Sequence, residues 1–144
     1  MHVVSGTEVR DFLDSSKRVY LCGKLDNPDL KSHCPTDGLE IGISKYADYT
    51  AELPHYHSLN YEYNYVVHGS VKVFVLGEGK EYLLREKDLF VIAPHMGYVT
   101  KCSPDTEVLF VKYPGGNDKV QLPLTAAVQK WQENWDNTME KTET

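Results

Sequence analysis

The sequence contains the stretch PHYHSLNYEYNYVVHG, residues 54–69, which decides how the rest of the chain is interpreted. Residues two apart on a β-strand point to the same face, so His55 and His57 project together, about 7 Å apart along the strand. A turn of a few residues returns Glu62 to the same place. Two imidazoles and one carboxylate form a facial ligand set, which suits a borderline divalent metal ion and leaves coordination positions open.

An H-x-H pair also occurs on solvated strands that bind no ion. The pair by itself therefore does not distinguish a metal site from such a strand. Glu62 at its spacing, followed by Gly69, favours the metal site. The sequence therefore predicts one divalent transition metal ion held by His55, His57 and Glu62, with Fe, Mn, Ni and Zn undecided.

This stretch resembles the first motif of the cupin superfamily, in which H-x-H is followed by three or four residues, E, six residues and G. The four anchors of that motif are matched by His55, His57, Glu62 and Gly69. The resemblance extends over residues 39–113.

The second cupin motif is matched only in part. Asp88 fits its acidic turn, and residues 89–93 fit the apolar strand that follows. Tyr98 stands where the family's third histidine usually stands, and Cys102 stands where its asparagine stands.

The resemblance implies an all-β fold, a small jelly-roll barrel with a metal ion inside it, held by His55, His57 and Glu62. Tyr98 then belongs to the inner wall, opposite the strand that carries the two histidines, and contacts the substrate. A bond from its phenolate to the metal is the alternative, which favours harder ions. With His55 and His57, Tyr98 completes the set of candidate catalytic residues.

The chain of 144 residues has room for one domain. Residues 1–38 are expected to form a helix, a strand and a loop that pack on the barrel, because Ser5 and Glu8 have the spacing of a capping box. Residues 39–116 show short strands and turns with no helices between them, which is typical of an antiparallel barrel. Residues 117–144 are expected to form an amphipathic helix and a polar tail.

Strand parity extends the inner face of the barrel beyond the motif residues. The positions expected to face inward are Asn64 and Val66 after Glu62, and Thr100 and Cys102 after Tyr98. The same parity reaches His68, for which a polar residue at the strand end is favoured over a catalytic role. For Cys102, a small buried residue is favoured over a reactive thiol, because no base is identifiable beside it.

Two apolar surfaces favour a homodimer. The predicted C-terminal helix has an apolar stripe formed by Leu124, Val128, Trp131 and Trp135, which packs on the barrel or on a second subunit. Alternate tyrosines in residues 61–65 face outward when the glutamate between them faces inward, and offer further apolar area to bury.

The composition excludes several classes of protein. The net charge of −6, with no block of Lys and Arg, argues against binding to nucleic acid or to anionic lipid. The longest apolar run, residues 89–93, is far too short to span a membrane. No secretory signal is visible, and three cysteines at unrelated spacings indicate free thiols, so a cytoplasmic location is expected.

The favoured function is an enzyme that acts on a small polar metabolite. Residues 67–73, VHGSVKV, resemble the corresponding stretch of nucleotide-sugar ketoisomerases and epimerases, in which barrel histidines move protons beside a carbonyl and no metal is required. His55 or His57 would be the base. The alternatives are a non-enzymatic barrel that senses a small ligand, a metal-dependent dioxygenase, and a storage-type barrel with a vestigial site.

Overall fold

The computed structural model describes residues 1–139. Its two helices are α1 (Gly6–Leu13) and α2 (Ala126–Gln132). The strands of the first sheet are β1 (Arg18–Gly23), β2 (Cys34–Pro35), β3 (Glu40–Tyr46), β6 (Tyr61–His68), β9 (Leu89–Ile92) and β11 (Thr106–Tyr113). The strands of the second sheet are β4 (Thr50–Ala51), β5 (His55–His57), β7 (Ser70–Val75), β8 (Lys80–Arg85), β10 (Tyr98–Cys102) and β12 (Lys119–Gln121).

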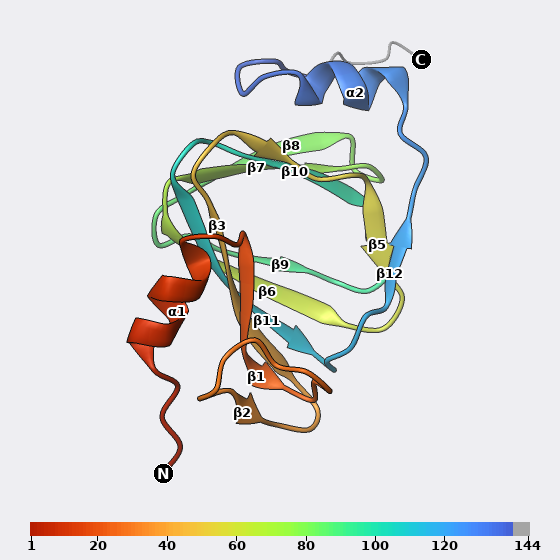
Figure 1. Ribbon diagram of the computed structural model, residues 1–144. Coiled ribbons are helices and arrows are strands. Elements are labelled where there is room, and N and C mark those ends of the chain that lie inside the picture. The colour runs from red at the N-terminus through yellow and green to blue at the C-terminus, as the bar shows by residue number, and fades with distance from the viewer. Residues whose placement is uncertain (140–144) are drawn as a thin grey trace.

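The two sheets pack face to face, with one helix near each end of the described chain (Figure 1). The strand order is β2-β1-β3-β11-β6-β9 in the first sheet and β12-β5-β10-β7-β8 in the second, where β4 also pairs with β10. The pairing of β1 with β2 is parallel, and the pairings that build the rest of the two sheets are antiparallel. This is the all-β, jelly-roll-like fold that the sequence predicted.

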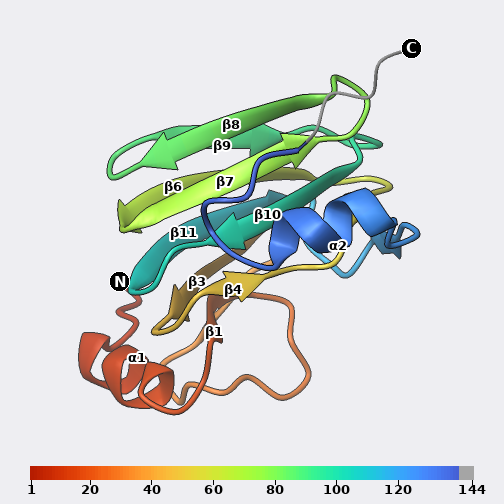
Figure 2. The same cartoon turned by 90° about the horizontal axis from the view of Figure 1, so that it is seen from above.

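The core lies between the two sheets because alternate residues of their strands point inward. On β11 the buried positions are Thr106, Val108, Phe110 and Lys112, with less buried residues between them. β10 differs, since all of its residues are buried. Its outer face is covered by α2, which crosses over β10 (Figure 2).

Helix α2 seals the outer face of the second sheet with a small apolar cluster. Val128 and Trp131 pack there against Phe74 and Val99. The helix is shorter than the predicted apolar stripe, because Leu124 lies before its cap and Trp135 lies after its end. Thr125 caps it, and its hydroxyl accepts a hydrogen bond from the backbone N–H of Val128 at 3.2 Å.

The N-terminal segment contains a helix and then a strand. Ser5 caps α1, and its hydroxyl accepts a hydrogen bond from the backbone N–H of Glu8 at 3.3 Å. The strand that comes next, β1, pairs with β3 and belongs to the first sheet rather than packing on it from outside.

The barrel also extends past residue 116, where the sequence predicted only a helix and a tail. Strand β12 pairs with the free edge of β5, and Lys119 lies opposite His57 in the register. Pro123 keeps the residue before it extended, which delays the start of the helix. The closing strand brings the segment around Asp118 next to the two histidines.

No helix within residues 1–139 is both long enough and apolar enough to cross a lipid bilayer.

Candidate functional site

The histidine pair lies on β5 with both rings on the same buried face, as the alternation of a strand requires. His55 is 3% exposed and His57 is 1% exposed, whereas Tyr56 between them is less buried. The two ring centroids lie 5.2 Å apart with the rings nearly perpendicular. The prediction that these side chains project together is confirmed.

His57 lies between two carboxylates. Its Nδ1 atom is 2.9 Å from Oδ1 of Asp118, and its Nε2 atom is 3.0 Å from Oε2 of Glu62. A carboxylate accepts hydrogen bonds and donates none, so both ring nitrogens donate and the ring carries a positive charge. Burial lowers the pKa of His57, but its hydrogen bonds to Glu62 and Asp118 outweigh that effect and raise the pKa overall.

Asp118 is itself fixed in place by the turn after β5. It accepts hydrogen bonds from the backbone N–H groups of Leu59 and Asn60, at 2.8 and 2.7 Å, and from the Asn60 side-chain amide at 2.7 Å. Burial raises the pKa of Asp118, but these hydrogen bonds and that of His57 lower it overall. The carboxylate is therefore a fixed negative charge behind His57.

Glu62 reaches His57 from the opposite sheet, because β6 belongs to the first sheet and β5 to the second. Burial raises the pKa of Glu62, but the hydrogen bond to His57 and the positive charge of Lys112 lower it overall. The predicted convergence of His57 and Glu62 on one place is thus found, with the two groups in direct contact.

His55 has the opposite protonation pattern. Its Nδ1 atom lies 2.8 Å from the carbonyl oxygen of Leu53 and donates to it. The Nε2 atom then carries the lone pair, and it accepts from the Tyr98 hydroxyl at 2.9 Å. Burial lowers the pKa of His55. One ring of the pair is therefore neutral while the other is charged.

Tyr98 bridges the two histidines. Its hydroxyl is 2.9 Å from Nε2 of His55 and 3.2 Å from Nε2 of His57. It lies on β10, directly beside His55 in the same sheet, so the prediction that it faces the histidines from the opposite wall is wrong. Burial raises the pKa of Tyr98 well above its usual value, which keeps the phenol protonated.

Two small cavities adjoin this cluster inside the barrel. The one beside the histidines has a volume of about 20 Å³, and the one deeper in the interior has a volume of about 50 Å³. Arg18, Glu62 and Tyr98 line both. These volumes leave room for a few water molecules or for one small polar group.

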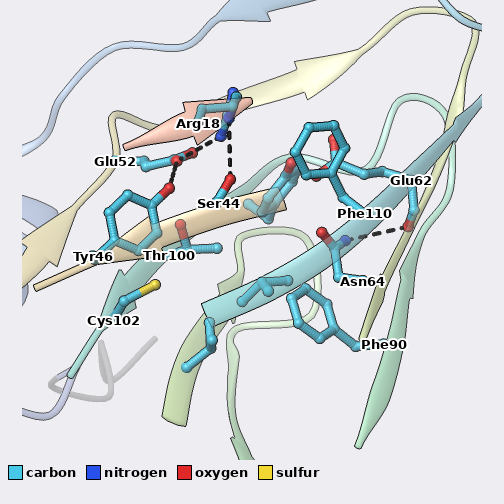
Figure 3. A pocket seen from close by; sticks show the side chains of 13 residues that line it. Arg18, Ser44, Tyr46, Glu52, Glu62, Asn64, Phe90, Thr100, Cys102 and Phe110 are labelled. Carbon is cyan, nitrogen blue, oxygen red and sulfur yellow. Dashed lines mark hydrogen bonds and ion pairs between the residues drawn. The ribbon is translucent and has the colours of Figure 1, made fainter. Parts of the chain in front are cut away.

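Glu52 lies at the centre of a network of polar contacts inside the barrel. Arg18 contacts its carboxylate at 3.3 Å and donates to the Ser44 hydroxyl at 3.1 Å, while the Tyr46 hydroxyl donates to Glu52 at 2.9 Å (Figure 3). Burial raises the pKa of the nearby Cys102 thiol to about 12, so this thiol is not a nucleophile at neutral pH.

Comparison with solved structures identifies the architecture. A conserved protein from Klebsiella pneumoniae with a double-stranded β-helix domain superimposes with a TM-score of 0.54 and 16% identity, over 62% of this chain and 78% of that one. The chain has a cupin fold.

Two further structures show the same cupin fold. KdgF from a Halomonas species is 27% identical, with a TM-score of 0.52, over 58% of this chain and 74% of its own. The polyketide cyclase RemF from Streptomyces resistomycificus is 14% identical, with a TM-score of 0.54, over 69% and 70% of the two chains. No family model matches the sequence, and no curated protein matches it at a significant level.

The types of donor in this cupin barrel fit a borderline divalent metal ion. Hydrogen bonds at both Nδ1 atoms leave the Nε2 atoms of His55 and His57 directed at the site, as is common in histidines that bind metals. The arrangement, however, is that of a hydrogen-bonded cluster, with Glu62 against His57 and Tyr98 between the rings. Within residues 1–139, no group of three or more His, Cys, Asp and Glu side chains could hold an ion. Metal binding therefore stays a prediction.

Most of the other positions expected on the inner face of the cupin barrel are buried. They are Asn64, Val66, Thr100 and Cys102. His68 is an exception, and its side chain contacts Glu86 and Asp105 at the surface. The register between β6 and β11 shifts just before His68, and such a bulge reverses the face on which the next residue lies.

Sequence reasoning missed several charged residues of the site, namely Arg18, Glu52, Lys112 and Asp118. One of them carried a signal. Lys112 alternates with Val108 and Phe110 on a predicted strand, so it had to share their inward face. Asp118 carried none, since it precedes a strand that the sequence did not reveal.

Proposed function

We propose that this cupin barrel is an enzyme of the isomerase or epimerase type, which moves a proton on a small polar metabolite, with sugars and sugar nucleotides as the first class to test. The observation that carries the proposal is the Tyr98 hydroxyl between a neutral and a charged histidine, 2.9 Å from His55 and 3.2 Å from His57. Two titratable groups whose surroundings push their pKa values apart are the usual mark of an acid and a base in one site.

The roles follow from the hydrogen bonds. His55 is neutral, and the lone pair on its Nε2 atom accepts from the Tyr98 hydroxyl until a substrate takes that place. It is therefore the base that takes a proton from the carbon beside a carbonyl group. His57 is positively charged and donates to the carbonyl oxygen as negative charge develops there. The protonated His55 then returns its proton to carbon, and His57 takes back a proton from a substrate hydroxyl, which completes the isomerisation and restores both rings. Tyr98, which donates to His55 and accepts from His57, holds the two rings in position.

The comparisons support the cupin fold of this proposal and not its chemistry. RemF, a polyketide cyclase, has the same fold, but at 14% identity the likeness concerns the fold alone. Because one fold carries many functions, the proposal rests on the histidine pair.

Exchange of substrate hydrogen with solvent tests the proposal. Aldose and ketose phosphates and keto forms of nucleotide sugars are incubated with the protein in D₂O, and deuterium at the carbon next to the carbonyl is followed by NMR. Exchange is expected with one of these classes, and His55→Gln should slow it by about 10²–10⁴-fold. Tyr98→Phe should slow it less.

His68→Gln is the matched control, because His68 lies at the surface away from the site. It should exchange at the wild-type rate. Absence of exchange across the whole panel, or an unchanged rate in His55→Gln, would contradict the proposal.

A metal centre is the second candidate function, favoured by the orientation of the two Nε2 atoms. His55, His57 and Glu62 would hold the ion, which would polarise a carbonyl oxygen of the substrate. Elemental analysis of protein purified without a polyhistidine tag tests it, with loss of metal expected in His55→Ala and in His57→Ala. Stoichiometric metal without turnover of any substrate would favour a sensor of small ligands instead.

A further inference from the structure

Lys112 is a buried lysine whose ammonium group forms no ion pair with any of residues 1–139. The side chain is 8% exposed, and it lines the cavity beside His55, His57 and Tyr98. Within residues 1–139, its ammonium group makes no hydrogen bond and has no carboxylate within 4 Å. Its neighbours are the rings of Phe110 and Tyr20, whose centroids lie 5.5 and 5.7 Å from the nitrogen.

This arrangement is unfavourable for an empty site. A buried charge costs free energy unless it is paired, and lysines are almost never buried without a partner. Contacts with two aromatic rings offset only part of that cost. A group that destabilises the folded chain in this way is characteristic of a binding site, where the missing partner comes from the ligand.

The carboxylates around the cavity are already engaged elsewhere. Glu52 contacts Arg18, and Glu62 contacts His57. Lys112 lies opposite Glu62 in the register of β11 and β6, yet no ion pair joins them within 4 Å. Lys119, an exposed residue next to His57 in the register, adds a second positive charge at the rim of the same cavity. The side chains that line the cavity therefore carry more positive than negative charges, while the carboxylates of Asp118 and Glu40 lie just outside the lining, on His57 and opposite Lys112 in the register.

We propose that Lys112 binds an anionic group of the substrate, a carboxylate or a phosphate, and so restricts the proposed enzyme to anionic metabolites. That the bound anion belongs to a substrate rests on the proposed function. The anion pairs with the Lys112 ammonium group, and the adjoining carbons then lie against the histidine pair and the Tyr98 hydroxyl. The cavity, at about 20 Å³, has room for no more than one water-sized atom group, so a single oxygen of the anion enters it and the rest of the molecule lies at the mouth.

The test measures anion binding without turnover, so it can succeed or fail independently of the isomerase proposal. Inorganic phosphate and glycolate are titrated separately into wild-type protein at constant ionic strength, and the ring resonances of His55 and His57 are followed by NMR. A saturable shift with one of the two anions is expected, and the anion that produces it distinguishes phosphate from carboxylate. Absence of a saturable shift with both would overturn the proposal.

The decisive variant is Lys112→Met, which keeps the length of the side chain and removes its charge. Its affinity for the anion should fall at least tenfold, while its denaturation midpoint without anion should rise, because an unpaired buried charge has been removed. Lys112→Arg should retain binding. Lys45→Met, at an exposed position on the outer face of β3, is the matched control and should bind as the wild type does.

Two results would contradict the role of Lys112. One is wild-type affinity in Lys112→Met, and the other is an equal loss of affinity in Lys45→Met, which would indicate a general effect of surface charge. If Lys112→Met does not fold, the Lys112→Gln variant decides the question. Loss of anion binding in folded Lys112→Gln would support the role of Lys112, and unchanged binding would contradict it.

Discussion

At the scale of single residues, the defining feature is His57 held between Asp118 and Glu62. The charge of Asp118 should raise the pKa of His57 in solution, and Asp118→Asn should lower it toward or below the ordinary value of about 6.5. Titration of the His57 ring by NMR measures this. Asp105→Asn is the control, since Asp105 contacts His68 at the surface, and it should leave His57 unchanged. An unshifted His57 in Asp118→Asn would mean that Asp118 only holds the turn.

The contacts of His57 with Asp118 and Glu62 also make the stability of the folded chain depend on pH. The pKa of His57 is raised in the folded chain, so its contribution to stability is complete below about pH 6.5 and is lost as pH rises through the raised pKa. Glu62 and Asp118 have lowered pKa values, so their contributions are lost as pH falls into the acid range. Asp118→Asn should flatten the loss above pH 6.5.

The residues of the site differ in how far the sequence could predict them. His55, His57, Glu62 and Tyr98 follow from motif spacing and strand parity, and they do lie together. Asp118 could not be found, because its contact with His57 depends on long-range pairing that no local pattern encodes.

At the scale of elements, α2 is fastened to the second sheet by Lys101. Its ammonium group donates to the backbone carbonyls of Trp131, Asn134 and Asn137 at 2.8, 3.0 and 2.7 Å. Lys101→Met should lower the free energy of unfolding by about 1–3 kcal/mol, because these carbonyls lose their donor. Urea denaturation measures the change, with Lys45→Met as the control. Equal stabilities of Lys101→Met and the wild type would contradict the anchoring role.

Elements with local signals were predictable and those without were not. The cap at Ser5 and the hairpin between β7 and β8 both have short-range signatures, and both are found. Strand β12 has three exposed residues and no alternation, so only the open edge of β5 explains its position.

At the scale of the whole molecule, the outer face of the first sheet packs with α1 over β1 and β3, and it is apolar and exposed over β6, β9 and β11. Its exposed side chains on β6, β9 and β11 are Tyr61, Tyr63, Tyr65, Val67, Leu89, Val91 and Tyr113. An exposed apolar face of this kind suits a second copy of the chain, so we expect a homodimer. Sedimentation should give twice the chain mass of 16.4 kDa at micromolar concentration.

Charge placed on this face should separate the subunits. Tyr63 and Val91 are neighbours in the register, and Tyr63→Lys with Val91→Lys should give monomers. Leu83→Lys changes an exposed apolar residue of the other sheet and should leave the mass unchanged. A wild-type protein that sediments as a monomer would contradict the expectation.

The position of Asp118 beside His57 also governs when the site can assemble. During synthesis the two histidines leave the ribosome about 60 residues before their anchor, and β11 must pair with β3 across a similar interval. Such distant pairings close large loops, so folding is expected on the slow, millisecond-to-second scale of β-rich chains. Until Asp118 emerges, a nascent chain holds both imidazoles without one of the two carboxylates that raise the pKa of His57, and the proposed activity is therefore expected only after β12 has been made.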